Sequence, residues 1–217
     1  MARSKSSQKW LKEHFDDPFV KQSRQDGYRS RAAYKLLEIQ KKDHILRRGM
    51  CVIDLGAAPG SFSQIAAECV GESGKIIALD LLLMTPLNSV DFIQGDFRDE
   101  SIQEKIREHL GGRKVDVIIS DMAPNMSGSR HIDIPRAMGL VEEVVYFASE
   151  VLAPGGSLLM KLFQGSGFDS LLKQVRSEFE KTMIRKPEAS RARSSECFLL
   201  AKGYKGNNFT MTDETTA

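Results

Sequence analysis

The sequence predicts an α/β fold in which a mostly parallel, seven-stranded sheet is covered by helices on both faces. From residue 49 onward, short β-rich segments alternate with helical ones. Such alternation requires crossover connections, which place helices on both faces of a parallel sheet. A glycine-containing turn directly follows the first strand segment, where ligands bind in sheets of this kind. The length of 217 residues suits one domain.

Each element is predicted from a short apolar run or from helical periodicity. The parallel strands are expected at residues 50–55, 75–79, 90–94, 115–120 and 157–163. Helices are expected at about residues 30–42, 63–70, 102–109, 136–152 and 168–179. The Pro-Gly-Gly sequence at residues 154–156 is expected to end the fourth helix. Residues 182–186 and 197–201 are expected to form the last two strands as an antiparallel pair, with one strand of the sheet antiparallel.

Charge divides the chain into a basic N-terminal arm (1–28), a folded domain (29–204) and a polar tail (205–217). Residues 1–48 hold thirteen Lys and Arg against six Asp and Glu, a balance of +7, whereas the remaining 169 residues carry −5. Aromatic residues such as Trp10 and Tyr28 are interleaved with these cations. The pattern indicates a polyanion such as nucleic acid as partner, and a solvated tail is the alternative.

Several classes of protein are disfavoured by the composition. No apolar run approaches the ~18–20 residues that cross a bilayer, and the N-terminus lacks the apolar region of a secretory signal. The three cysteines, which are Cys51, Cys69 and Cys197, contain no Cys-x-x-Cys pair. We therefore expect a cytoplasmic protein without a metal site or a membrane partner. A monomer is the expected state.

The turn after the first strand favours a ligand without phosphate. Gly56 and Gly60 lack the spacing of the dinucleotide fingerprint, and no Gly-Lys-Ser/Thr sequence follows. Asp54 precedes the first glycine, and a carboxylate there suits a ligand with an ammonium group. S-adenosylmethionine has this chemistry, although a plain tight turn is the alternative.

Three further carboxylates follow consecutive strands. Asp80 ends the second strand, where a carboxylate can accept both hydroxyls of a ribose. Asp96 follows the third strand, where it can meet an adenine, and Asp121 follows the fourth. Each alone is more often a helix cap or turn residue, but together they predict a nucleoside site at one edge of the sheet.

Five segments in order resemble the FtsJ/RrmJ family of S-adenosylmethionine-dependent RNA ribose 2'-O-methyltransferases, which have a Rossmann-like fold. They are DLGAAPGSFSQ (54–64), QGDFRD (94–99), SDMAPN (120–125), DIPRAM (133–138) and KLFQG (161–165). The resemblance covers about residues 28–202, which makes the folded domain the catalytic domain. It is closest to bacterial members that methylate a uridine ribose in 23S rRNA of the large ribosomal subunit.

The resemblance implies both a catalytic tetrad and cofactor contacts. The tetrad falls on Lys35, Asp121, Lys161 and Glu196. The cofactor contacts fall on Gly60, Phe62, Asp80, Asp96 and Asp121, and no metal is implied. Phe62 stands where bacterial members commonly have Trp, and residues 127–133 also depart from the family's pattern, so a loop on the RNA side is expected to differ.

The tetrad suits methyl transfer to a hydroxyl. A lysine that acts as a base must be neutral, but Lys35 favours the neutral form of Lys161 whereas Asp121 and Glu196 favour the charged one. We therefore expect Lys161 chiefly to orient the hydroxyl, with general-base action as the second option. Methylation of an adenine amino group is disfavoured because Asp-Met-Ala-Pro replaces the usual Asp-Pro-Pro-Tyr after the fourth strand.

Two alternatives to 23S rRNA methylation remain open. The same chemistry could act on tRNA or another RNA, because the tetrad is shared among those relatives. The protein could also be a ribosome-assembly factor with little turnover, which the complete tetrad disfavours. A small-molecule methyltransferase would not need the basic arm, so changes at Lys9 or Arg24 that weaken RNA binding would separate these classes.

Overall fold

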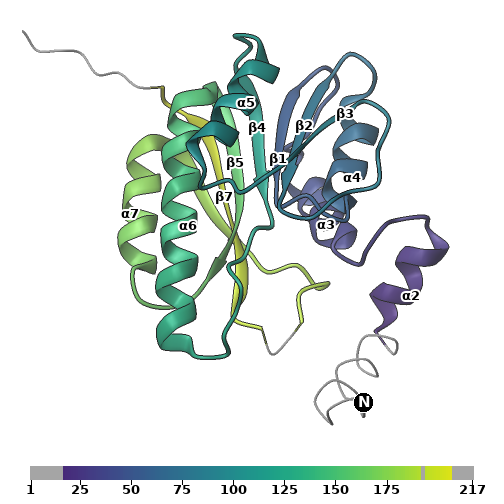
Figure 1. The fold of residues 1–217 in the computed structure, drawn as a ribbon. Helices are drawn as coiled ribbons and strands as arrows, with labels where there is room; N and C mark the ends of the chain where they lie inside the picture. Colours follow the sequence, from purple (N-terminus) through teal and green to yellow (C-terminus); the bar gives the residue numbers. More distant parts are fainter. Residues whose placement is uncertain (1–16, 192–193, 207–217) are drawn as a thin grey trace, which may run out of the picture.

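The computed structural model describes residues 17–191 and 194–206. Helices and strands alternate along the chain (Figure 1). The helices are α2 (Pro18–Gln25), α3 (Ala33–Asp43), α4 (Ser61–Val70), α5 (Glu100–Leu110), α6 (Arg130–Val151) and α7 (Phe168–Glu178). The strands are β1 (Cys51–Leu55), β2 (Lys75–Asp80), β3 (Val90–Gln94), β4 (Val115–Ser120), β5 (Leu152–Phe163), β6 (Phe179–Arg185) and β7 (Glu196–Tyr204).

The seven strands form one sheet in the order β3-β2-β1-β4-β5-β7-β6. Strands β1 to β5 pair in parallel, and β7 is antiparallel to both of its neighbours. This confirms the predicted sheet with one antiparallel strand. The strand order reverses at β1, which lies between β2 and β4, so a crevice is expected at the carboxyl ends of these strands.

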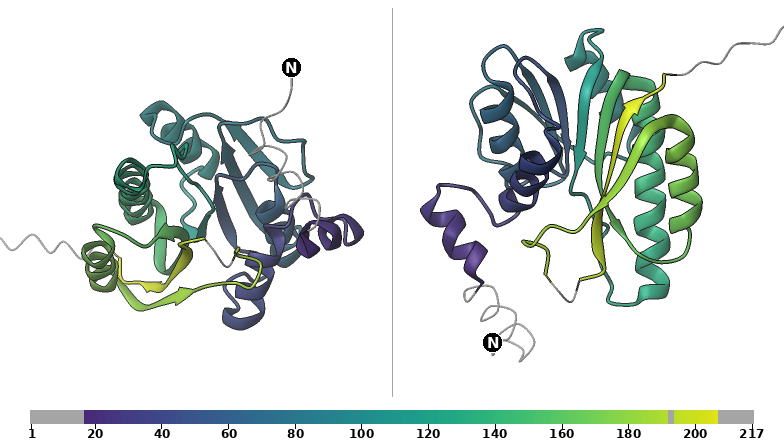
Figure 2. Two further views of the ribbon diagram at one scale, coloured as in Figure 1. Left: turned by 90° about the horizontal axis from the view of Figure 1, so that it is seen from below. Right: turned by 180° about the vertical axis from the view of Figure 1, so that it is seen from behind.

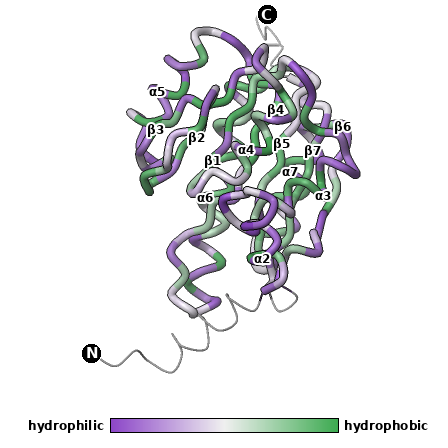
Figure 3. Tube along the Cα trace, turned by 90° about the vertical axis from the view of Figure 1, so that its right-hand side faces the viewer, coloured by the Kyte–Doolittle hydropathy of each residue, from purple (hydrophilic) through white to green (hydrophobic). Residues whose placement is uncertain are grey.

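Helices cover both faces of the sheet (Figure 2). On one face, α3 and α4 pack through residues such as Leu36 and Ile65. On the other, α5, α6 and α7 pack through Ile106, Phe147 and Val175. All five residues of β1 are buried, as expected for a central strand that helices cover on both faces. Figure 3 shows the resulting layering, with hydrophobic strands at the middle of the sheet and hydrophilic segments toward the outside.

Helix α6 begins six residues earlier than the sequence analysis predicted, at Arg130 instead of 136, and Pro135 lies inside it. The buried Asp133 explains the early start. Its carboxylate accepts hydrogen bonds from the backbone N–H of Ser127 at 2.8 Å, the Ser127 hydroxyl at 2.8 Å and the backbone N–H of Gly128 at 2.9 Å. These bonds hold the preceding loop against the first turn of the helix.

Strand β5 also begins earlier than predicted. The pairing of β4 with β5 shifts from Val115↔Leu152 to Val117↔Ser157, so residues 153–156 form an irregularity inside the strand. The Pro-Gly-Gly sequence therefore bulges within β5 after α6 has ended, rather than forming a separate turn.

The described part of the basic arm contains a helix that the sequence analysis missed. α2 begins at Pro18 after Asp17, whose carboxylate caps the N–H of Phe19 at 3.0 Å. The Phe19 ring lies 5.5 Å from that of Tyr34 on α3, and Arg31 forms an ion pair with Asp17. Residues 1–16, including the predicted RNA contact Lys9, and residues 207–217 of the tail lie outside the described residues. Among those described, no helix combines the length and apolarity needed to cross a membrane.

Candidate active site

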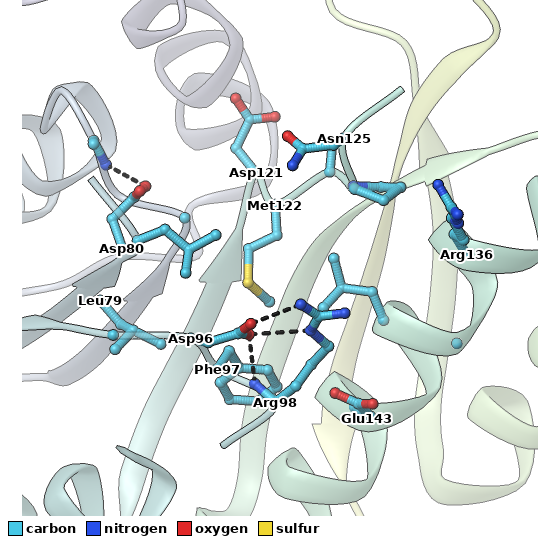
Figure 4. A pocket seen from close by; sticks show the side chains of 18 of the residues that line it. Leu79, Asp80, Asp96, Phe97, Arg98, Asp121, Met122, Asn125, Arg136 and Glu143 are labelled. Carbon is cyan, nitrogen blue, oxygen red and sulfur yellow. Dashed lines mark hydrogen bonds and ion pairs between the residues drawn. The ribbon is translucent and has the colours of Figure 1, made fainter. Parts of the chain in front are cut away.

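A cavity of about 640 Å³ lies at the carboxyl ends of β1 to β4 (Figure 4). Its strand-side wall carries Asp80, Asp96 and Asp121. The N-terminal and middle turns of α6 form another wall and contribute Arg136 and Glu143. The volume is in the usual range for small-molecule sites. The structure thus brings together the three carboxylates that were predicted to follow consecutive strands.

Backbone donors fix the carboxylate of Asp80. The N–H of Ala58, in the turn after β1, donates to Oδ2 at 2.8 Å, and the N–H of Leu82 donates to Oδ1 at 2.8 Å. Because each carboxylate oxygen can accept two hydrogen bonds, both oxygens keep one free acceptor site. Asp80 therefore links two loops and can still accept two hydroxyl donors.

Arg98 holds the carboxylate of Asp96. The backbone N–H and Nε of Arg98 donate to Oδ1 at 3.0 and 3.1 Å, and Nη2 donates to Oδ2 at 2.6 Å (Figure 4). The side-chain hydrogen bonds from Arg98 lower the pKa of Asp96, so the carboxylate is ionised and its direction is fixed. Three of its four acceptor sites are used, and Oδ2 retains one.

The four residues of the predicted tetrad meet beside this cavity, although they come from four different elements. Lys161 Nζ lies 3.0 Å from Asp121 Oδ1 and also donates to the Asp121 carbonyl. Lys35 Nζ lies 2.9 Å from Glu196 Oε1 and 3.8 Å from Asp121 Oδ1. Asp121 is therefore the carboxylate shared by the two lysines, and it also lines the cavity.

The tetrad is poorly accessible to water. The exposed fractions of its side chains are 9% for Lys161, 11% for Lys35, 15% for Glu196 and 20% for Asp121. Burial alone raises the pKa of Glu196, but the charge and hydrogen bond of Lys35 outweigh it and the net pKa is lowered. Lys35 also lies over the ring of Phe198, 5.6 Å from its centroid. The cluster thus keeps Glu196 ionised in a mostly dry environment.

Two residues predicted as cofactor contacts do not line the cavity. Phe62 is buried in the core, where its ring lies 6.3 Å from that of Phe198. Gly60 is the left-handed N-cap of α4 with φ of 107°, and a Cβ there would lie 2.7 Å from both Arg29 Nη1 and Met84 Sδ. Their roles toward a cofactor remain predictions.

Asp54 lies away from the cavity as well, contrary to the expectation that it faces a ligand. Its side chain is fully buried, and its Oδ2 accepts a hydrogen bond from the Ser63 hydroxyl on α4 at 2.6 Å. Burial raises the pKa of Asp54 to about 7, against the opposing effect of the Ser63 hydrogen bond. Because its side chain points toward α4, Asp54 connects β1 to α4 below the turn that follows β1.

Arg29 was not singled out by the sequence, yet it connects both loops that flank the cavity. Its Nη1 donates to the carbonyls of Pro59 at 2.9 Å and Thr85 at 2.6 Å, and its Nη2 donates to that of Pro86 at 2.9 Å. Its backbone N–H donates to Gln64 Oε1 on α4 at 2.9 Å. Only the general excess of cations over residues 1–48 pointed to this position, because the carbonyl partners of Arg29 are remote in sequence.

Met122 and Glu143 are further lining residues that the sequence analysis missed. In Figure 4, Met122 extends from the end of β4 toward Asp96, and Glu143 lies beside Arg98. Burial raises the pKa of Glu143, although Arg98 opposes the effect. Glu143 lies on α6, and helical periodicity alone cannot show that this face of the helix borders a cavity.

The fold and this site are those of a methyltransferase, and the comparisons with known proteins identify the family. A family model described as "FtsJ-like methyltransferase" matches residues 28–204. The chain belongs to this family.

Close relatives share most of the sequence. "Ribosomal RNA large subunit methyltransferase E" of Pseudomonas aeruginosa is 57% identical over 206 residues, covering 95% of this chain and all of the relative. The protein of the same name from Legionella pneumophila is 55% identical over 204 residues, covering 94% and 99%.

Solved structures agree with this assignment. A Plasmodium falciparum protein assigned as a ribosomal RNA methyltransferase superposes with a TM-score of 0.74 at 32% identity, over 82% of this chain and all of that one. Human methyltransferase-like protein 13, solved in complex with SAH, has a TM-score of 0.50 at 14% identity over 86% of this chain and 81% of that chain, which supports the fold alone.

Proposed function

We propose that this protein uses S-adenosylmethionine to methylate the 2'-hydroxyl of a uridine ribose in 23S rRNA of the large ribosomal subunit. The observation that carries the proposal is the meeting of Lys35, Asp121, Lys161 and Glu196 beside an acidic cavity. The family membership and the ribosomal RNA methyltransferases at 55–57% identity support the choice of substrate.

The cavity residues fit S-adenosylmethionine, which supplies a methyl group on a sulfonium. The free acceptor sites of Asp80 suit the two ribose hydroxyls, and the remaining site on Asp96 Oδ2 suits the adenine amino group. The carboxylates of Asp80, Asp96 and Asp121 give the cavity an acidic wall that suits a cationic ligand. Gly60 and Phe62 complete the proposed cofactor set, with Gly60 shaping the turn before α4 and the buried Phe62 supporting that turn from the core.

Lys161 orients the attacking hydroxyl. Its Nζ already donates to the Asp121 carbonyl and lies 3.0 Å from Oδ1 of the same residue, so the ammonium is held in place. A further N–H of that group can donate to the ribose oxygen and align it with the methyl group. The hydroxyl proton leaves as the methyl group is transferred, and general-base action by Lys161 is the second option for its removal. The Lys35–Glu196 pair holds Asp121 from the other side.

The RNA partner is expected to contact the basic arm, residues 1–28, with the catalytic domain at 29–204 and the tail at 205–217. Arg24 lies in the last turn of α2 and is one proposed phosphate contact. Lys9 is another. We further propose that the protein acts as a monomer in the cytoplasm, where ribosomal subunits are its substrate.

The test is methyl transfer from labelled S-adenosylmethionine to large ribosomal subunits that lack their own ribose methylation. Free 23S rRNA, tRNA and the Lys161→Ala variant run in parallel. Label that maps to a uridine 2'-oxygen of 23S rRNA, and is absent with the variant, is the expected result. Label in tRNA alone would move the substrate to tRNA. No label on any RNA, with cofactor binding intact, would favour an assembly role.

A further inference from the structure

Beyond the cavity and tetrad, a second hollow of about 600 Å³ lies where the C-terminal turn of α3 meets the edge of the sheet. Its lining includes Lys42 and Asp43 from α3, Lys181, Met183 and Arg185 from β6, and Lys202 from β7. We call it the β6–β7 groove. None of these residues belongs to the proposed cofactor site or tetrad.

The groove exists because α3 covers only part of its face of the sheet. Phe198 and Leu200 on β7 are buried under α3 and α4. Their cross-strand partners on β6 are Arg185 and Met183, and Lys181 pairs with Lys202. Partners in an antiparallel pair share a face, so the cations continue the covered face beyond the edge of α3.

Asp43 fixes two of the four cations. Arg185 Nε and Nη2 donate to the two oxygens of the Asp43 carboxylate at 2.8 and 2.6 Å, and Lys202 Nζ donates to its backbone carbonyl at 2.9 Å. The side chain of Asp43 is 7% exposed, so this anion is covered by its partners. Lys42 and Lys181 are exposed, and within the described residues no ion pair occupies their ammonium groups.

β7 and α3 each carry residues of both the groove and the tetrad. Glu196 begins β7 at the tetrad and Lys202 lies near its other end, about 20 Å away at the usual rise per strand residue. Lys35 and Lys42 lie two turns apart on α3, about 10 Å along its axis. Lys186, which follows β6, donates to the Glu196 carbonyl at the tetrad end of β7.

We infer that the β6–β7 groove binds the phosphate backbone of the substrate RNA a few nucleotides away from the ribose held at the tetrad. The inference rests on the proposed function for the identity of the RNA. The groove residues carry four cations and two carboxylates, the covered Asp43 and the exposed Glu180. The cations outnumber the carboxylates, so the net charge is complementary to a polyanion. Lys42 and Lys181 make the phosphate contacts, and the Asp43-bound Arg185 and Lys202 supply a fixed positive field.

The test compares two double variants with equal change in charge. Lys42→Glu/Lys181→Glu alters the groove, whereas Lys105→Glu/Lys173→Glu alters exposed lysines on α5 and α7, on the other side of the sheet. Binding of protein-free 23S rRNA is measured over a salt series, together with KM and kcat on large subunits. Thermal unfolding checks that each variant is folded.

We expect the groove variant to raise the Kd for RNA roughly tenfold, and to reduce the slope of log Kd against log salt by about 1.4 to 1.8 for two lost contacts. The KM for subunits rises, and kcat at saturating substrate and cofactor binding stay unchanged. Equal effects in the two double variants would overturn the inference. An effect seen with subunits but not with protein-free rRNA would also overturn it, because the partner would then be a ribosomal protein.

Failure of the inference differs from failure of the proposed function. If the wild type methylates rRNA while the groove variant matches the control in Kd and KM, only the groove assignment is wrong. If the wild type methylates no rRNA but its RNA binding depends on Lys42 and Lys181, the groove assignment holds and the proposed reaction is wrong.

Discussion

The ammonium of Lys35 on α3 lies 2.9 Å from the carboxylate of Glu196 at the start of β7, so the two ends of the described chain are tied together at the active site. The pair is mostly buried and lowers the pKa of Glu196. Its position beside Asp121 means that a change in either partner also alters the charge around Lys161, which contacts the same carboxylate. This coupling can be measured.

A double-mutant cycle of Lys35→Met and Glu196→Gln tests the coupling. Each single change leaves one mostly buried charge without its partner, so we expect a loss of about 3 kcal/mol in the free energy of unfolding. The double variant should lose less than the sum of the two, by about 1 kcal/mol, in urea unfolding at pH 7. Strict additivity would show that the two charges act independently.

Replacing Lys161 with Ala should abolish methyl transfer and leave cofactor affinity within a few-fold of the wild type. The ammonium contacts Asp121 and does not line the cavity that carries Asp80 and Asp96, so its loss should leave the cofactor contacts in place. Isothermal titration with S-adenosylmethionine and a labelled-methyl assay measure the two quantities. Lys114→Ala is the matched control, because Lys114 Nζ also donates to a backbone carbonyl, that of Glu150 at 2.8 Å. A parallel loss of affinity and activity in Lys161→Ala would contradict the orienting role.

Arg29→Ala should weaken cofactor binding because the guanidinium connects the turn after β1 to the loop after β2. We expect Kd for S-adenosylmethionine to rise roughly tenfold, since about 1.4 kcal/mol of loop ordering then has to be supplied on binding. At saturating cofactor, kcat should be nearly unchanged. Arg29→Lys should recover only part of the affinity, because an ammonium cannot span the three carbonyls as the planar guanidinium does.

A suitable control for Arg29 is Arg113→Ala, which removes a guanidinium that donates to the Gly49 carbonyl at 2.6 Å, before the start of β1. An equal loss of affinity in this variant would assign the effect to general destabilisation.

Asp54→Asn should change how stability depends on pH. The pKa of Asp54 is raised from 3.8 to about 7, so between these values the folded state holds one proton more than the unfolded state. The stability contributed by this proton is present at low pH and is lost as pH rises through the folded pKa. Removing the carboxyl should therefore stabilise the variant relative to wild type by about 2 kcal/mol more at pH 8 than at pH 5. Thermal unfolding across this range measures it, and parallel curves would contradict the raised pKa.

Much of the fold could be predicted because its signals are local. Apolar runs located the strands of the sheet, and the carboxylates after β2, β3 and β4 predicted one acidic edge. The tetrad came from motif resemblance, since nothing local connects Lys35 to Glu196. Helix α2 was missed because it has only eight residues, fewer than the window over which helical periodicity can be recognised.

The other misses depend on tertiary structure. The early start of α6 depends on the hydrogen bonds of Asp133 to the loop before it, and the role of Arg29 depends on carbonyls from two separate loops. For Asp54, the sequence predicted a role toward the ligand that the structure does not support. Its place in the motif suggested a residue facing the ligand, but the direction of its side chain is set by the packing of β1 on α4. Such contacts are fixed only when the whole sheet is assembled.

The strand order leaves β3 and β6 as the two free margins of the sheet. A free margin exposes unpaired backbone groups that can recruit a strand from another molecule, and charged side chains oppose such pairing. β3 carries Asp91, half exposed and 3.4 Å from Lys75, and β6 carries the exposed Glu180 and Lys181. Both margins of the described sheet thus carry charge that disfavours self-association through added strands, so neither margin needs a covering segment to keep the folded protein from pairing with a second copy.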